Sequence, residues 1–222
     1  MSSSRSSKNS AQDGLDSRSL SYADDLIPAV EAVRTAREQA VLSGAPALSN
    51  GACATLTMLA RALDAQAVVE IGTSTGASGL AFFAGMNERG VLTSIDAQTQ
   101  WQVQARQAFT AERIPTRRFR LIPGSPLDVL NNLRDGAYDI VFINGDKLEY
   151  AEYLDQALRL LRPGGLVILN EVLWRNKVAD PSDEEDEALI IRETLTAAIE
   201  NEDLTSALLP VGEGLFVAVT AR

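Results

Sequence analysis

Short apolar runs that alternate with segments of helical period constrain the fold of this chain more than any other feature. The strands expected from these runs cover residues 67–71, 91–96, 118–122, 138–143 and 165–170. The helices expected among them cover residues 76–86, 98–112, 125–134 and 149–161. All-apolar strands separated by amphipathic helices are typical of a parallel sheet that is covered on both faces.

The end of the chain predicts a hairpin that completes this sheet. A helix with an acidic start is expected over 183–200, and two further runs, 204–210 and 215–220, flank the turn Val211-Gly-Glu-Gly214. We therefore predict a doubly wound, mostly parallel, seven-stranded α/β sheet with one antiparallel strand near the C-terminus and helices on both faces.

The start of the chain has a different composition. Residues 1–20 are polar, rich in Ser and without periodicity, which predicts a disordered tail ahead of a single domain over residues 21–222. Order is expected from about Tyr22. Apolar residues then recur at helical spacing from Ile27 to Ala40, Gly44 ends that helix, and a second helix begins near Ser49.

Composition excludes several classes of function. The formal net charge of -10 disfavours a nucleic-acid surface, which needs a basic patch. The first residues lack the apolar stretch of a signal peptide, and no apolar run reaches membrane-spanning length. The single cysteine, Cys53, cannot form an internal disulfide, which favours the cytoplasm. Because the chain has no histidine, a catalytic base would have to be Lys, Asp, Glu or Tyr.

The segment from Val68 to Asp96 resembles a nucleoside-binding crossover. An apolar run ends near Glu70, a glycine-rich turn opens a helix, and the next apolar run ends in Asp96. Glycine permits close approach of a ligand to the backbone, a helix start offers free N–H groups, and a strand-end carboxylate can accept ribose hydroxyls. A plainer interpretation is that the glycines only allow tight packing of a helix on a strand.

Two details of this crossover separate possible ligands. The glycines stand at positions 72, 76 and 79, whereas a dinucleotide fingerprint requires G-x-G-x-x-G. No Lys or Arg lies between Val68 and Met86, and Glu70 would repel a pyrophosphate and attract a cation. Both details favour the sulfonium of S-adenosylmethionine over a nicotinamide dinucleotide.

Four segments together resemble bacterial members of the class I S-adenosylmethionine-dependent O-methyltransferases, in the family that contains catechol and caffeoyl-CoA O-methyltransferases. The segments are residues 70–78, 138–150, 161–174 and 209–215, and the match extends over about residues 46–220. The resemblance implies that the following residues surround the cofactor: Glu70, Gly72, Thr73, Ser74, Gly76, Ser78, Asp96, Ala97, Trp101, Ser125, Pro126 and Asn144. Asp96 would bind the ribose, Trp101 could equally be a helix-packing residue, and the loop 44–50 should approach the cofactor.

The resemblance also implies a divalent metal site, from which this chain departs. Family members hold magnesium with an Asp and with an Asp-Asn pair, whereas this chain has Asn144, Asn170 and Glu171 at those positions. Magnesium prefers carboxylate oxygens, so we expect its affinity to be reduced and leave metal dependence open. The alternative is that these three residues form a hydrogen-bonded polar floor to the pocket.

Lys147 matches the catalytic lysine of the family. The resemblance implies that it removes the acceptor proton or stabilises the developing oxyanion. The first role requires that burial or nearby positive charge lower its pKa from about 10.4. The alternative is an exposed surface lysine.

The sequence thus predicts an O-methyltransferase that acts on a small-molecule acceptor, with hydroxylated aromatics suggested by the resemblance. Family members commonly pair, so a homodimer through the first two helices is expected, with no nucleic-acid or membrane partner. Two alternatives remain: an S-adenosylmethionine-binding sensor or partner protein that has lost catalysis, and an NAD-dependent oxidoreductase.

Overall fold

The computed structural model describes residues 16–221 and contains a seven-stranded sheet in the order β3-β2-β1-β4-β5-β7-β6. The strands are β1 (Ala67–Ile71), β2 (Val91–Asp96), β3 (Phe119–Pro123), β4 (Tyr138–Ile143), β5 (Leu161–Asn170), β6 (Leu204–Leu209) and β7 (Leu215–Thr220). β7 runs antiparallel to both of its neighbours, and all other neighbouring strands are parallel. The predicted sheet is confirmed.

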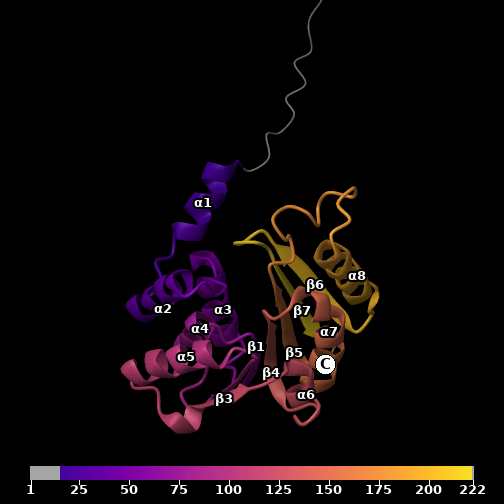
Figure 1. Ribbon diagram of the computed structural model, residues 1–222. Coiled ribbons are helices and arrows are strands. Elements are labelled where there is room, and N and C mark those ends of the chain that lie inside the picture. The colour runs from indigo at the N-terminus through magenta and orange to yellow at the C-terminus, as the bar shows by residue number, and fades with distance from the viewer. Residues whose placement is uncertain (1–15, 222) are drawn as a thin grey trace, which may run out of the picture.

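Helices cover both faces of this sheet, as predicted. They are α1 (Ser17–Asp25), α2 (Glu31–Leu42), α3 (Asn50–Ala62), α4 (Ala77–Gly85), α5 (Thr99–Ala111), α6 (Pro126–Leu130), α7 (Tyr150–Leu160) and α8 (Asp186–Glu200), with short 3-10 helices η1 (Thr116–Arg118) and η2 (Lys147–Glu149). Figure 1 shows α2 to α5 on one side of the sheet and α6 to α8 on the other.

The two faces bury separate apolar clusters because successive strand side chains point to opposite faces. In β4, Ile140 and Phe142 pack under the first helix layer, and Val141 and Ile143 pack under the second. This alternation explains why residues 140–143 of β4 are all apolar.

The prediction of disorder up to residue 20 was wrong for the described part of that segment. Residues 1–15 lie outside the described residues, but α1 begins at Ser17. Asp16 caps the helix by accepting a hydrogen bond from the Ser19 N–H at 2.8 Å. A capping carboxylate satisfies an otherwise free N–H group, an effect that composition alone does not reveal.

The next helix begins later than its apolar spacing predicted. α2 starts at Glu31, and Ile27 and Val30 precede it with exposed side chains. The Asn50 side chain holds this connection by accepting from the Ala29 N–H at 2.9 Å and donating to the Ile27 carbonyl at 2.5 Å. A long-range contact therefore overrides the local helical pattern.

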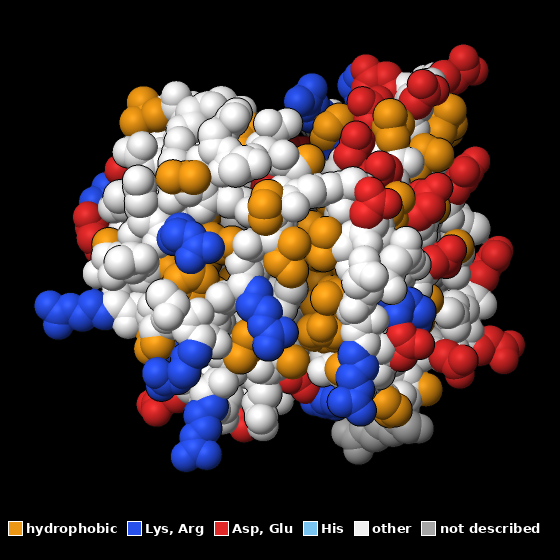
Figure 2. All heavy atoms as spheres, turned by 60° about the horizontal axis from the view of Figure 1, so that its bottom comes forward, with side chains coloured by type: hydrophobic (Ala, Val, Ile, Leu, Met, Phe, Trp, Pro, Cys, Tyr) orange, Lys and Arg blue, Asp and Glu red, His pale blue; other side chains and the backbone are white. Residues whose placement is uncertain are grey.

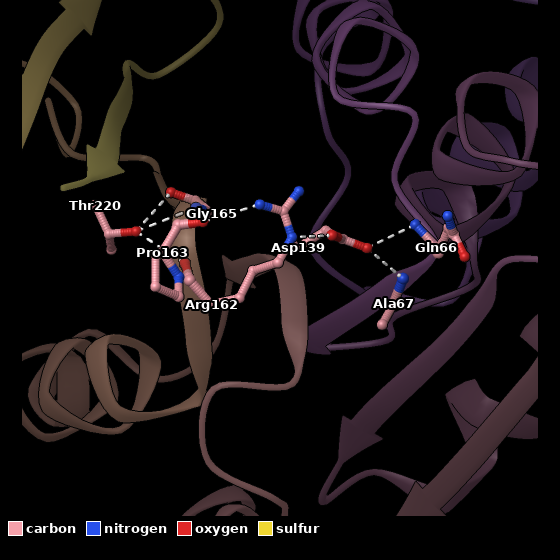
Figure 3. A network of polar contacts seen from close by, with 7 residues as sticks. All are labelled: Gln66, Ala67, Asp139, Arg162, Pro163, Gly165 and Thr220. Atoms are coloured by element: carbon pink, nitrogen blue, oxygen red, sulfur yellow. Dashed lines mark hydrogen bonds and ion pairs between the residues drawn. The ribbon is translucent and has the colours of Figure 1, made fainter. Parts of the chain in front are cut away.

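The amino edge of the sheet is tied together around Asp139 (Figure 3). Its carboxylate accepts from the N–H groups of Gln66 and Ala67 at 2.6 and 2.7 Å and from Arg162 at 2.5 Å. The Thr220 hydroxyl donates to the Arg162 carbonyl at 3.0 Å, which joins β7 to the same network.

Figure 2 turns this side toward the viewer and shows carboxylates crowded toward α7 and α8, with basic side chains spread over the rest.

The opposite, carboxyl edge collects the polar residues that follow the parallel strands. Gly72, Asp96, Asn144 and Glu171 stand at or just after the ends of β1, β2, β4 and β5. Ligands of doubly wound sheets bind at this edge. Within residues 16–221, none of the helices combines the length and apolar character that a transmembrane helix needs.

Candidate active site

A cleft of about 460 Å³ opens at the carboxyl edge of the sheet. Its lining includes eight residues that the resemblance assigns to the cofactor: Gly72, Ser74, Asp96, Ala97, Trp101, Ser125, Pro126 and Asn144. The remaining lining residues are Pro46, Gln98, Gly145, Asp146, Glu149 and Tyr153. Three carboxylates and no Lys or Arg line the cleft, so its charge suits a cationic ligand better than a phosphate.

Gly72 lies where the backbones of two strand-end loops meet. Its φ is +93°, and a Cβ at this position would lie 2.2 Å from the carbonyl oxygen of Asn144. The Gly72 N–H donates to Ile95, and the Asn144 N–H donates to Ile71, both at 2.8 Å. Only glycine permits this approach, which brings the ends of β1 and β4 together beneath the cleft.

Gly76 packs against a helix and does not line the cleft. It precedes α4, and a Cβ there would lie 2.9 Å from the Phe109 ring and 3.0 Å from Ala105, both in α5. Gly76 therefore serves helix packing, which was the plainer interpretation of the glycine spacing. Gly72 instead allows the close approach of two backbone segments.

Asp96 is oriented at the cleft by backbone donors. The N–H groups of Ser74 and Gln98 donate to its two carboxylate oxygens at 2.9 and 2.8 Å. Burial raises the pKa of Asp96 above its ordinary value, and these backbone hydrogen bonds oppose the shift. Each oxygen retains a lone pair for a ligand hydroxyl.

The loop 44–50 reaches the cleft through Pro46. The Ser74 hydroxyl donates to the Pro46 carbonyl at 2.8 Å, and Pro46 is part of the cleft lining. The loop therefore lies at the cleft, and its approach to the cofactor stays a prediction. Its register could not be read from the sequence because the contact depends on Ser74, which has a left-handed φ of +48°.

Glu70 lies beneath the cleft lining. Its side chain is fully buried, and its carboxylate oxygens accept from the Ser78 and Ser94 hydroxyls. The Thr73 hydroxyl lies 2.7 Å from that of Ser94 and belongs to the same network. Three residues assigned by resemblance to the cofactor, Glu70, Thr73 and Ser78, thus form a buried support below the cleft.

The pKa of Glu70 leads to a testable pH dependence. Burial is the main cause that raises it from about 4.5 to about 7, and the charge of Asp96 adds to the shift. Since the folded state then holds the proton more tightly than the unfolded chain, the free energy of unfolding should fall between these pH values, by about 3 kcal/mol, and level off above them. Glu70→Gln should abolish this fall. Urea unfolding at about pH 5 and about pH 8 gives the free energy of unfolding of the wild type and of Glu70→Gln. If both proteins lose the same stability between these pH values, the pKa of Glu70 is not raised.

A larger hollow, of about 910 Å³, lies at the same edge of the sheet. Residues of α1 and α3, the turn between β6 and β7 and the end of β5 line it, including Leu20, Met58, Asn170 and Glu171. The Asn170 amide donates to the side-chain oxygen of Asn144 at 2.8 Å. Because Asn144 lines the cleft, this hydrogen bond joins the linings of the two cavities.

The candidate metal ligands come together at this junction, but they do not fit a divalent cation. The Asn144 oxygen accepts from Asn170, and the Glu171 carboxylate pairs with the Lys147 ammonium at 2.8 Å. Among residues 16–221, no group of three or more His, Cys, Asp or Glu side chains is arranged to hold a metal ion. One carboxylate already paired with a lysine is a poor donor set for magnesium. The arrangement matches the alternative interpretation, a polar floor.

Lys147 is buried at the junction, so the surface-lysine alternative was wrong. Its side chain is 8% exposed, and Nζ lies 4.9 Å from the Tyr150 ring centroid and 5.5 Å from that of Trp174. Burial alone would lower the pKa of Lys147, but Tyr150 and Glu171 outweigh it and raise the pKa above its ordinary value. The lowering of the pKa that a role as base would require is therefore not found in this environment.

The segment that begins at Glu171 has an unusual backbone. Glu171, Trp174, Arg175 and Asn176 all have left-handed φ angles, from +40° to +67°. The N–H groups of Val172 and Leu173 donate to the carbonyls of Gly214 and Glu213 at 3.1 and 2.9 Å, which holds the segment. Such conformations cost about 1–3 kcal/mol each and cluster at functional sites.

Among the lining residues that were not assigned to the cofactor from the sequence, Glu149 and Tyr153 form a pair. The Tyr153 hydroxyl donates to the Glu149 carboxylate, and both side chains line the cleft. Burial is the main cause that raises the pKa of Tyr153, so its phenol stays protonated. Their helical spacing of four residues was the available signal, but it equally suits core packing.

Known proteins are similar to this chain in both sequence and fold. The family model described as O-methyltransferase matches residues 23–221. A protein of Mycobacterium sp. (strain JLS), provisionally named an O-methyltransferase, is 40% identical over 199 residues that cover 90% of each chain. A crystal structure from Corynebacterium glutamicum has a TM-score of 0.84 at 28% identity, covering 91% of this chain and 95% of that one.

One solved structure with the same fold contains a bound cofactor. The O-methyltransferase TomG from Streptomyces achromogenes was crystallised in complex with S-adenosylmethionine; its TM-score is 0.81 at 24% identity, covering 91% of this chain and 95% of TomG. At this identity the similarity shows a common fold. The family model and the mycobacterial relative together establish that this chain belongs to the O-methyltransferase family.

Proposed function

We propose that this protein transfers a methyl group from S-adenosylmethionine to a hydroxyl group of a small molecule. The observation that carries the proposal is the junction of two cavities at the Asn144–Asn170 hydrogen bond, beside the Lys147 ammonium. A donor in the acidic cleft and an acceptor in the larger hollow would face each other across this junction. The shared fold with TomG supports the choice of cofactor.

The cleft residues divide the cofactor among them in this proposal. Asp96 accepts the ribose hydroxyls, and Trp101, Ser125 and Pro126 contact the adenine. Gly72, Ser74, Ala97 and Asn144 lie along the rest of the molecule, all on the lining of one cleft. The cleft volume of about 460 Å³ is within the range of small-molecule and cofactor sites.

The chemistry requires positioning and charge stabilisation. The acceptor oxygen attacks the methyl carbon, the carbon–sulfur bond breaks, and its electron pair stays on sulfur, which becomes neutral. The acceptor loses a proton during this step, so negative charge develops on its oxygen. The buried Lys147 ammonium is placed to stabilise that charge, because a preorganised charge in a largely dry site is more effective than water.

Cofactor binding is tested by calorimetric titration with S-adenosylhomocysteine. Asp96→Ala should weaken binding at least tenfold, since hydrogen bonds from ligand hydroxyls to a charged acceptor are worth about 1.5–3 kcal/mol each. Asp128→Ala, an exposed carboxylate in α6, is the control and should bind as the wild type does. Thermal protection by NADH and not by S-adenosylhomocysteine would contradict the proposal. Tight binding without methyl transfer to any phenol would favour a sensor.

We also propose that the protein acts in the cytoplasm as a homodimer. The free Cys53 supports a reducing compartment. Val41 and Leu42, at the end of α2, are 71% and 77% exposed and supply apolar surface for a partner. Sedimentation analysis of the wild type and of Val41→Ser/Leu42→Ser tests this surface, and a monomeric wild type would contradict it.

A further inference from the structure

We propose that the Lys147–Glu171 ion pair takes the place of a divalent cation in this protein, with Glu171 receiving the acceptor proton and Lys147 stabilising the acceptor oxygen. The inference rests on the proposed methyl transfer and adds how the acceptor is activated. A cation is not used because Asn144, Asn170 and Glu171 stand where its ligands would be.

The Lys147–Glu171 pair and the two amides carry no net charge between them. Lys147 contributes one positive charge, Glu171 one negative charge, and the two amides none. A divalent ion near Glu171 would face the Lys147 ammonium, whose Nζ lies 2.8 Å from the carboxylate oxygen. Binding the ion would therefore break the ion pair and leave a buried ammonium unpaired, which is strongly unfavourable.

The amide pair is equally unsuited to a hard cation. The Asn144 oxygen already accepts from the Asn170 amide at 2.8 Å, and the Tyr150 hydroxyl donates to the Asn170 backbone carbonyl at 2.8 Å. Asp146, the nearest other carboxylate in the chain, caps η2 by accepting from the Leu148 N–H at 3.1 Å. These oxygens satisfy local donors, whereas magnesium requires several oxygens directed at one point.

The ion pair is oriented so that its carboxylate faces the acceptor side. Glu171 lines the larger hollow with its side chain 22% exposed, while Lys147 is 8% exposed below it. The rings of Tyr150 and Trp174 flank the ammonium and limit where it can move. An acceptor hydroxyl in the hollow can therefore reach the carboxylate and lie beside the ammonium.

The step balances with these two groups alone. The acceptor O–H gives its proton to a Glu171 oxygen, the oxygen electron pair forms the new bond to the methyl carbon, and the carbon–sulfur pair returns to sulfur. Lys147 donates a hydrogen bond to the acceptor oxygen as negative charge develops on it. Glu171 passes the proton to water after the products leave.

Binding of Mn²⁺, followed by its electron paramagnetic resonance signal in the presence of S-adenosylhomocysteine, tests the inference without an acceptor. The wild type should show no saturable site, whereas N144D/N170D/E171N should show one, because carboxylate ligands raise the affinity of an oxygen site. A saturable site in the wild type, or a triple variant that binds no better while retaining S-adenosylhomocysteine affinity, would overturn it. If the triple variant does not fold, N170D/E171N replaces no residue of the cleft lining and carries the same expectation.

Turnover with catechol as the probe acceptor tests the roles of the pair. A chelator should leave turnover unchanged, and Glu171→Gln should lower it at least tenfold with S-adenosylhomocysteine affinity retained. Glu193→Gln, at an exposed carboxylate of α8 that lines neither cavity, is the control and should keep full turnover. Loss of turnover with chelator and recovery with magnesium would refute the inference. Failure to bind S-adenosylhomocysteine would contradict the proposed function instead.

Discussion

Replacing Lys147 with methionine is expected to lower turnover at least tenfold while the affinity for S-adenosylhomocysteine stays unchanged. Methionine keeps an unbranched side chain in the space between the Tyr150 and Trp174 rings but removes the charge that pairs with Glu171. Removing one preorganised charge at a developing oxyanion typically costs about 3 kcal/mol of transition-state stabilisation. Steady-state kinetics with catechol and calorimetry with S-adenosylhomocysteine measure the two quantities separately.

Lys177→Met is the matched control for this variant. Lys177 pairs with Glu185 in a more exposed position, in the segment that follows β5. Its replacement should leave both turnover and cofactor affinity unchanged, since exposed ion pairs contribute little. Wild-type turnover in Lys147→Met would refute the proposed role, and a parallel loss of S-adenosylhomocysteine affinity would reassign Lys147 to the support of the cleft.

Replacing Gly72 with alanine should destabilise the protein by more than about 3 kcal/mol and abolish cofactor binding. The new Cβ would lie 2.2 Å from the Asn144 carbonyl oxygen, which is backbone and cannot rotate away. The ends of β1 and β4 would have to separate, and both carry residues that line the cleft. Urea unfolding measures the loss of stability, and calorimetry measures the loss of affinity.

Gly136→Ala separates the backbone strain of this change from its steric effect. Gly136 also has a positive φ, +61°, but a Cβ there would meet nothing within 4 Å. Its replacement should cost about 1 kcal/mol, the usual penalty for a left-handed alanine. If Gly72→Ala and Gly136→Ala lose the same stability, the close approach at Asn144 does not hold the cleft together.

Local patterns were sufficient to predict the sheet and much of the cleft. Strand side chains alternate with a period of two, and parallel strands end at one edge, so Gly72, Asp96 and Asn144 were expected near one another. The same patterns failed where a contact comes from far along the chain. Asn50 shifts the start of α2, and Asp16 begins a helix in a segment whose composition suggests disorder.

The roles of the glycines and of Glu70 show the limit of sequence motifs. Gly72 and Gly76 belong to one spacing pattern, yet one meets the Asn144 backbone and the other meets Phe109. Glu70 was expected to face a cationic ligand, but hydroxyls of Ser78 and Ser94 take up its carboxylate below the cleft. A motif predicts which residues lie near a site. How deeply each side chain is buried below the cleft depends on how the helices pack on the sheet.

The sequence by itself determined which segments form strands and which polar residues follow them at one edge of the sheet. It also showed that the chain has no histidine and lacks the usual carboxylate ligands of the family. Only the tertiary structure decided that Lys147 is buried and paired with Glu171, and that a hydrogen bond between Asn144 and Asn170 joins the linings of the two cavities. The physical reason is the distance along the chain over which each effect acts. Hydrophobic periodicity and turn residues act within a few positions, whereas the charge state and partners of a buried side chain depend on groups that the fold brings from distant segments.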